Sequence, residues 1–237
     1  MPIHRPNGID QPRIQNDCKR SAPCFESRCA WGMLVGVRII AGSLRSRRLE
    51  APPGVATRPS SDRLRETLFN VLAPHIQGAA FVDLYAGSGA VGMEALSRGA
   101  AQVEFVERDP AALKILRGNL ERLGIGEGFH IHACAVGAFL RRAAEAGRKQ
   151  EQSEADRKRE RYEVLFLDPP WDAAEEYVAT LGLLGGKADG MLSADAVVIA
   201  EHRRKMRLED RYGLLERMRL LEQGDAALSF YALVRSA

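Results

Sequence analysis

The sequence predicts an α/β fold in which helices cover both faces of a mostly parallel β-sheet. Short apolar segments alternate with longer segments of helical period over residues 79–201, which is typical of parallel sheets with crossover helices. The short segments are apolar throughout, as in strands buried on both faces. Near the C-terminus, Gly224 and Asp225 separate two strand-like segments. This turn predicts a hairpin that makes the last strand antiparallel.

Local patterns set the expected elements in chain order. Residues 37–41 and 47–51 predict a small β-hairpin, and residues 61–72 predict a helix capped by Ser60 or Ser61. Asp109 before Pro110 suits the N-cap of a later helix. Runs of apolar residues predict strands at residues 79–85, 103–107, 130–134, 164–167, 196–201, 214–222 and 227–234. Apolar residues at helical spacing predict helices at residues 93–97, 110–123, 136–146 and 173–184.

One domain over residues 37–237 is expected, because a chain of 237 residues that is 46% hydrophobic can build one core. Residues 1–28 are polar and without periodicity, and a disordered N-terminal extension is expected over residues 1–36. Met33 is a candidate start of the native chain. Residues 147–161 hold six basic and four acidic residues, as in a solvated helix extension or a flexible loop. The cysteine and histidine spacings match no metal-binding pattern, so no metal site is predicted.

The basic residues gather in an N-terminal segment, residues 37–75, although the net charge is only +3. Arginine binds phosphate oxygens in pairs, so this segment is a candidate surface for a polyanion such as RNA; a solvated surface is the alternative. The proposed RNA contacts are Arg45, Arg47, Arg48, Arg58, Arg63 and Arg65. No stretch approaches the ~20 apolar residues that span a bilayer, and the N-terminus lacks a signal peptide's apolar core. A cytoplasmic protein without membrane contact is expected.

The most informative motif is an apolar strand that ends in Asp168, Pro169, Pro170 and Trp171. The prolines end strand pairing and hold the backbone extended. A carboxylate, a main-chain carbonyl and a flat aromatic face are thereby placed close together. They suit a planar heterocycle with an exocyclic NH2 group, which can stack on the indole and donate to the two oxygens. The alternative is a strand followed by a structural Pro-Pro turn.

A glycine-rich loop follows an earlier strand that ends near Asp83. Gly87, Gly89 and Gly92 match the G-x-G-x-x-G pattern, and Glu107 ends the next strand, where a ribose-binding acid is expected. The pattern alone fits either a nicotinamide cofactor or S-adenosylmethionine. Asp83 favours S-adenosylmethionine, because a carboxylate there suits an ammonium group and not a pyrophosphate. The Asp-Pro-Pro-Trp motif also has no evident role in hydride transfer.

The two motifs together resemble class I methyltransferases that act on exocyclic or amide nitrogens. Residues 38–42 and the run Arg-Pro-Ser-Ser-Asp-Arg-Leu-Arg-Glu-Thr-Leu-Phe-Asn at 58–70, with residues 224–231, resemble the RsmD family of bacterial 16S rRNA guanine-N2 methyltransferases. The resemblance covers residues 38–234. The chain departs from the family in its N-terminal extension, in the 147–161 insert and in Trp171, where Phe is more usual.

This resemblance implies a Rossmann-like, seven-stranded, mostly parallel sheet with an antiparallel last strand. It implies S-adenosylmethionine as cofactor and ribosomal RNA, within the small subunit, as partner of a monomeric enzyme. Asp168 and the Pro169 carbonyl would orient the amino group, and Trp171 would stack on the base. The expected cofactor contacts are Asp83, Gly87, Gly89, Glu107 and Ala135.

Three other functions remain open at this point. A DNA adenine-N6 methyltransferase shares both motifs, although the core from residue 79 to residue 234 leaves no room for a target-recognition domain. A protein glutamine methyltransferase would prefer Asn in place of Asp168. A non-catalytic RNA-binding protein with a methyltransferase-like fold is disfavoured by the intact acidic positions Asp83, Glu107 and Asp168.

Overall fold

The computed structural model describes residues 37–51, 59–150, 161–186 and 189–234, with the side chains of 59–61, 147–150 and 189 excepted. Every described residue belongs to one compact unit, Val35–Ala237. The expectations for residues 1–36, for the helix cap at Ser60 or Ser61, for Arg58 and for most of the 147–161 insert lie outside the described part.

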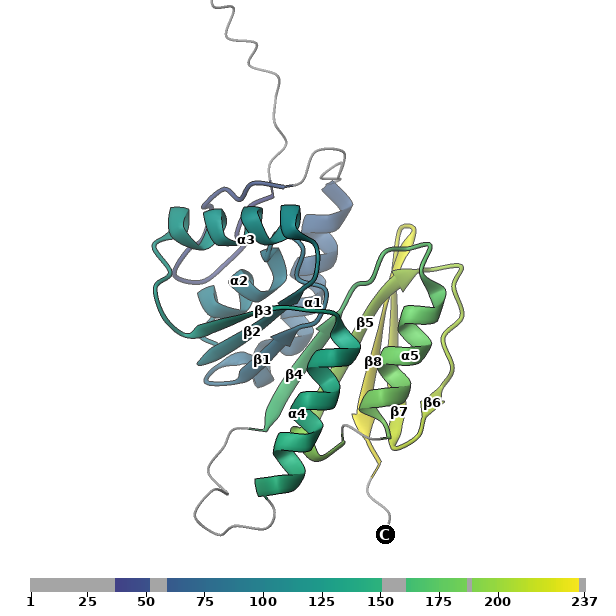
Figure 1. Cartoon of the computed structure of the whole chain (residues 1–237). Helices are drawn as coiled ribbons and strands as arrows, with labels where there is room; N and C mark the ends of the chain where they lie inside the picture. Colours follow the sequence, from purple (N-terminus) through teal and green to yellow (C-terminus); the bar gives the residue numbers. More distant parts are fainter. Residues whose placement is uncertain (1–36, 52–58, 151–160, 187–188, 235–237) are drawn as a thin grey trace, which may run out of the picture. The chain divides into compact units, whose positions relative to one another are not determined.

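This unit is built on one sheet with the strand order β3-β2-β1-β4-β5-β8-β7-β6 (Figure 1). Strands β1 to β5 pair in parallel, and β8, β7 and β6 each pair antiparallel with their neighbour. Their bounds are β1 Ala80–Asp83, β2 Gln102–Glu107, β3 Phe129–Ala133, β4 Tyr162–Leu167, β5 Leu192–Arg203, β6 Arg211–Tyr212, β7 Leu215–Gln223 and β8 Ala226–Leu233. The mostly parallel sheet with an antiparallel last strand is therefore confirmed.

The sheet has one more strand than the seven expected. The additional strand, β6, consists of Arg211 and Tyr212 only, and it pairs with the start of β7. A strand of two residues is too short to produce a recognisable period in the sequence. Only its pairing with β7 in the folded chain identifies β6 as a strand.

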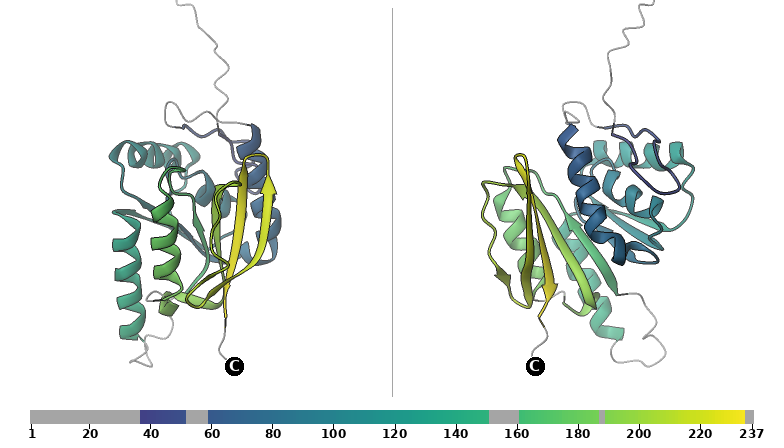
Figure 2. Two further views of the ribbon diagram at one scale, coloured as in Figure 1. Left: turned by 90° about the vertical axis from the view of Figure 1, so that its right-hand side faces the viewer. Right: turned by 180° about the vertical axis from the view of Figure 1, so that it is seen from behind.

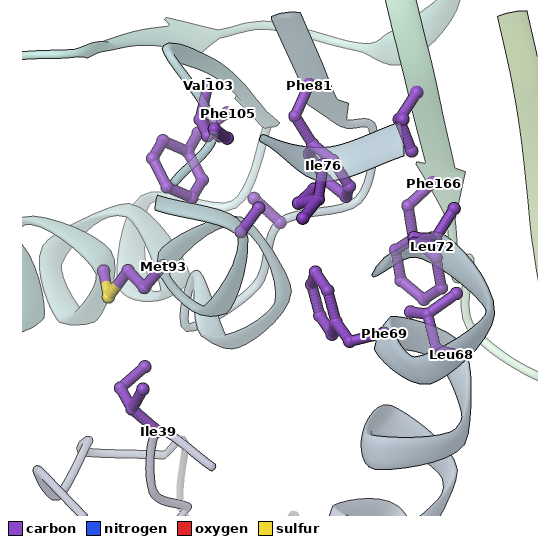
Figure 3. Close-up of a cluster of buried hydrophobic side chains, with 14 of the residues drawn as sticks. Ile39, Leu68, Phe69, Leu72, Ile76, Phe81, Met93, Val103, Phe105 and Phe166 are labelled. Atoms are coloured by element: carbon purple, nitrogen blue, oxygen red, sulfur yellow. The ribbon is translucent and has the colours of Figure 1, made fainter. Parts of the chain in front are cut away.

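Within the described residues, five α-helices cover the sheet: α1 Pro59–Ile76, α2 Ala90–Ser97, α3 Pro110–Leu123, α4 Val136–Gln150 and α5 Ala174–Leu184. One apolar cluster joins α1, α2 and α3 to one face of the sheet, and a second joins α4 and α5 to the other. The two faces can be compared in Figure 1 and, from behind, in Figure 2. In the first cluster, Phe69 and Leu72 of α1 lie near Phe81 of β1 and Phe166 of β4 (Figure 3).

Most expected elements are present, with displaced ends. Helix α3 has the predicted bounds, and the Asp109 carboxylate accepts from Ala112 N at 2.8 Å, so the N-cap is confirmed. Helix α4 continues to Gln150, so the insert begins as a helix extension. The expected hairpin at residues 37–51 is reduced to a single antiparallel bridge, Arg38 with Arg48. None of the helices within the described residues combines the length and hydrophobicity that spanning a membrane requires.

The 37–51 segment is held on α2 and α3 by buried polar side chains and not by strand pairing. The Glu94 carboxylate accepts from Ile40 N at 2.6 Å and from Ala41 N at 3.0 Å. Asn119 exchanges two hydrogen bonds with the Glu50 backbone, at 2.8 and 2.9 Å. At Gly42 (φ +84°) an added Cβ would lie 1.8 Å from the Ser97 carbonyl oxygen, so only glycine allows this approach. The 37–51 segment is therefore held in a fixed position against α2 and α3.

Candidate active site

A cavity of about 850 Å³ opens at the carboxyl ends of the parallel strands, where open α/β sheets bind ligands. Its volume is within the ~300–1,000 Å³ usual for small-molecule sites. The cavity brings together seven of the eight residues that the sequence assigned to the cofactor or to catalysis. These are Asp83, Gly87, Glu107, Ala135, Asp168, Pro169 and Trp171.

Gly87 lies on the loop between β1 and α2 and lines the cavity. Its backbone is left-handed (φ +53°), and an added Cβ would meet nothing nearer than Tyr85 O at 4.0 Å. A side chain here would therefore strain the backbone and enter the space beside the loop. This open cradle suits a ligand that approaches the backbone closely.

Gly89 is the exception among the expected cofactor residues, because it does not line the cavity. It is buried, with φ +80°, and precedes the first turn of α2. An added Cβ would lie 2.4 Å from Leu116 Cδ1 and 2.8 Å from Met93 Cε. A Cβ added at Gly92 would likewise lie 2.3 Å from the Phe105 ring. These two glycines are required by packing between α2 and the core, so the expected cofactor contact of Gly89 is replaced by a structural role.

Asp83 is a buried carboxylate at the end of β1, with 1% of its surface exposed. One oxygen accepts from Gly92 N at 3.0 Å. The pKa of Asp83 is raised to about 7, mainly by burial and to a smaller extent by the neighbouring carboxylates of Asp168 and Glu107, against the lowering effect of the Gly92 hydrogen bond. A cation bound in the cavity would favour the ionised form of Asp83, so this carboxyl group suits a positively charged part of a ligand.

Glu107 organises the glycine loop before any ligand binds. One of its oxygens accepts from Gly87 N at 2.8 Å, and the other accepts from Arg108 N and Asp109 N, both at 2.7 Å. These bonds fix the carboxylate at the cavity edge while leaving acceptor capacity for hydroxyl groups. Ala135, between β3 and α4, is exposed and lines the same cavity, and its methyl group takes up little of the space there.

The Asp-Pro-Pro-Trp motif leaves the sheet directly after β4 and forms the other side of the cavity. The indole N–H of Trp171 hydrogen-bonds to the Asp168 carboxylate and favours its ionised form. Trp171 is half-buried, and the Arg203 guanidinium lies over its ring at 5.0 Å from the centroid. Trp171 therefore has two contacts, of which sequence reasoning anticipated neither.

Glu201, near the end of β5, lines the cavity beside Asp168 and was not among the predicted residues. Burial raises the pKa of Asp168 well above the usual carboxyl range, and the Glu201 carboxylate raises it further. Burial also raises the pKa of Glu201 to about 7, against the lowering effect of Arg65. The only sequence signal for Glu201 was an acid at the end of a strand, and its partner becomes clear only from the β4–β5 pairing.

Arg65 was expected to contact RNA, and this expectation is wrong, because only 7% of it is exposed. Its guanidinium donates to Arg38 O at 2.8 Å and to the Asp62 carboxylate at 2.9 Å, and it lines the cavity. It is an interior cation that faces Glu201. The other proposed contacts within the described residues are solvent-exposed, namely Arg45, Arg47, Arg48 and Arg63.

Comparisons with known proteins agree with this geometry. A family model described as "Conserved hypothetical protein 95" matches residues 37–232. The chain is 34% identical over 195 residues to YlbH of Bacillus subtilis (strain 168), across 82% of this chain and 98% of that protein. It is 38% identical over 167 residues to ribosomal RNA small subunit methyltransferase D of Escherichia coli (strain K12), across 70% and 74% of the two chains.

Among solved structures, YhhF from Escherichia coli matches with a TM-score of 0.67 and 30% identity, covering 84% of this chain and 98% of that one. The family match, the curated relatives and the strand-end cavity agree. The chain therefore belongs to the RsmD family of class I, S-adenosylmethionine-dependent rRNA methyltransferases.

Proposed function

We propose that this protein transfers a methyl group from S-adenosylmethionine to the exocyclic N2 amino group of one guanine in small-subunit (16S) ribosomal RNA. The observation that carries the proposal is that Asp168, Pro169 and Trp171 share one cavity with Gly87 and Glu107. The residues that would orient an amine therefore lie in the same cavity as the residues that would bind an adenosyl cofactor. The curated relative in Escherichia coli is named as a small-subunit rRNA methyltransferase, which supports this choice of substrate.

The cofactor half of the cavity fits S-adenosylmethionine in shape and in charge. Glu107 would accept the ribose hydroxyls, Asp83 would face the ammonium group, and Gly87 and Ala135 would leave room for the ligand. When bound there, S-adenosylmethionine supplies an activated methyl group on a sulfonium centre. The protein then has to hold the accepting nitrogen in line with the methyl carbon and the sulfur. Such positioning is worth up to ~7–11 kcal/mol in favourable cases.

The target half of the cavity would hold the base. An aromatic amine is a poor nucleophile because its lone pair is shared with the ring. Hydrogen bonds to Asp168 and to the Pro169 carbonyl would draw the nitrogen towards tetrahedral geometry and make that pair available. The Asp168 carboxylate would also stabilise the positive charge that develops on nitrogen. Trp171 would replace the stacking that the base loses on leaving its RNA neighbours.

The exposed arginines of the 37–51 segment would meet the RNA backbone. Glu94 and Asn119 hold this segment rigidly beside the cavity, so phosphate contacts made there would position the RNA relative to Asp168. The residues proposed to bind the cofactor and those proposed to hold the target base line one cavity, so the site of this chain already contains both sets. We therefore propose that the enzyme acts as a monomer and that it works in the cytoplasm, where ribosomal subunits are assembled.

Mapping of methylated nucleosides tests the proposal. Ribosomal RNA from a strain that lacks the gene should lose one N2-methylguanosine, and purified protein with S-adenosylmethionine should restore it. Asp168→Ala should abolish methyl transfer while leaving the affinity for S-adenosylhomocysteine nearly unchanged. Asp172→Ala, at an exposed neighbouring acid, is the matched control and should retain activity. Appearance of N6-methyladenosine instead would reject the guanine assignment.

A further inference from the structure

Glu201 is a cavity residue to which the reaction described above gives no role. It follows Ala200 in β5, and Ala200 pairs with Leu167 of β4 in a parallel register. The next residues along the two strands, Asp168 and Glu201, are therefore neighbours, and adjacent strands lie ~4.8 Å apart. Both residues line the same cavity. Two carboxylates thus stand side by side where a target base would enter.

The two carboxylates lie on the same face of the sheet. Side chains alternate along a strand, so Asp168 shares the face of Phe166 and Glu201 shares the face of Ile199. Phe166 and Ile199 are register partners, and both belong to the apolar cluster that packs under α1. Arg65 comes from α1 on this face, and its buried Nε has no hydrogen-bond partner among the described residues. Arg65 is therefore a buried cation that interacts with Glu201, one member of the carboxylate pair.

Tyr177 of α5 ties the ends of the two strands together. Its hydroxyl donates to Glu201 O at 2.8 Å and lies 3.5 Å from Pro169 O, and its side chain is fully buried. The backbone of Glu201 is thereby held at a constant position relative to Asp168 and Pro169. The cavity end presents three fixed acceptors: two carboxylates and one main-chain carbonyl.

Guanine offers three hydrogens on the edge that carries the methylated nitrogen. Two are on the N2 amino group, and the third is on the adjacent ring nitrogen N1. Adenine differs, because its amino group lies beside an N1 that carries a lone pair and no hydrogen. A carboxylate opposite that lone pair would be repelled. Three acceptors at this end of the cavity therefore match guanine and mismatch adenine.

We infer that Glu201 accepts the N1 hydrogen of the target guanine, while Asp168 and Pro169 O accept the two amino hydrogens. Glu201 is in this role a specificity-determining residue, and Arg65 favours the ionised form of its carboxylate. The inference rests on the proposed function, since it requires guanine N2 as the methyl acceptor. It also explains why two carboxylates are held together: the base supplies the hydrogens that relieve their repulsion.

The test compares two RNAs that differ at the target position only. One carries guanine and the other carries 2-aminopurine, which has the same N2 amino group but no hydrogen on N1. Wild-type enzyme should prefer the guanine RNA in kcat/KM by about 10- to 100-fold, the range expected for loss of a hydrogen bond to a charged group. Glu201→Gln should reduce this preference several-fold, because its carboxamide can turn its NH2 group towards an N1 lone pair.

The ratio between variant and wild type isolates the N1 contact. 2-Aminopurine also lacks the O6 oxygen, but that loss affects both enzymes equally and cancels in the comparison. Glu216→Gln, at an exposed glutamate of β7, is the matched control and should keep the wild-type preference. If Glu201→Gln transfers no methyl group, the affinities of the two RNAs for the protein, measured by competition, give the same ratio.

An unchanged guanine preference in Glu201→Gln, with guanine still methylated, would overturn the inference and leave the proposed function intact. Equal use of both RNAs by the wild-type enzyme would overturn it in the same way. Failure of the wild-type enzyme to methylate any guanine of ribosomal RNA would instead reject the proposed function and the inference together.

Discussion

Replacement of Asp83 by asparagine should stabilise the protein above neutral pH and weaken cofactor binding. Asp83 is buried, and its pKa in the folded chain is about 7 against an ordinary value of 3.8. Ionisation is therefore less favourable in the folded state than in the unfolded state. The Asp83→Asn variant carries no charge at this position at any pH, and the amide oxygen of the new side chain can still accept from Gly92 N.

The sign and size of the effect follow from this difference in pKa. Below pH 3.8 Asp83 is protonated in both states and has no influence on stability. Between 3.8 and about 7 the unfolded chain is ionised while the folded chain keeps its proton, so stability falls as the pH rises. Above about 7 the decrease is complete, and at 1.36 kcal/mol per unit it reaches about 4 kcal/mol as an upper limit.

Denaturant unfolding at pH 5 and pH 8.5 measures this directly. Asp83→Asn should be more stable than wild type at both, with the difference larger by about 3 kcal/mol at pH 8.5. Its affinity for S-adenosylhomocysteine at pH 8.5 should fall by about 10- to 100-fold, because a charge-assisted hydrogen bond to the ammonium group is lost. Asp172→Asn, on the surface, should change neither quantity. A variant that is less stable than wild type at pH 8.5, or that binds the cofactor equally well, would refute this reasoning.

Three further predictions concern the target half of the cavity and the RNA surface. Because the pKa of Asp168 is raised and its ionised form is required, kcat/KM should rise with pH, and Glu201→Gln should move the rise to lower pH; a flat profile would contradict this. Trp171→Phe should retain activity but move the rise of kcat/KM to higher pH, since it keeps stacking and loses the N–H bond that favours the ionised form of Asp168. Trp171→Ala should be about 5- to 150-fold less active across the pH range, and equal losses in the two variants would assign the residue a structural role. Alanine at three exposed arginines should flatten the log–log salt dependence of RNA binding by up to about 0.7–0.9 for each phosphate that is no longer neutralised, and an unchanged slope would place the RNA surface elsewhere. These arginines are Arg45, Arg47 and Arg48.

Local patterns along the chain were enough to predict the fold class and most of the residues that line the cavity as candidates for cofactor binding and catalysis. Alternation of apolar and helical segments is a local property, so it predicted the parallel sheet, and α3 was predicted to the residue. Asp83, Glu107 and Asp168 were identified because each lies at or directly after the end of an apolar strand, and the carboxyl ends of parallel strands meet at one edge.

What the tertiary structure decided is which side chains meet across that edge. Glu201 is separated from Asp168 by 33 positions in the sequence (201 − 168), and only the pairing of β4 with β5 makes them neighbours. Arg65 and the exposed Arg63 have the same local sequence pattern. The helix nevertheless directs Arg65 into the cavity, where it is buried and interacts with Glu201. Gly89 and Gly87 belong to one motif, but one packs on Leu116 and the other faces open space. Burial and electrostatic coupling are properties of residues that are distant in sequence, so no local pattern could have specified them.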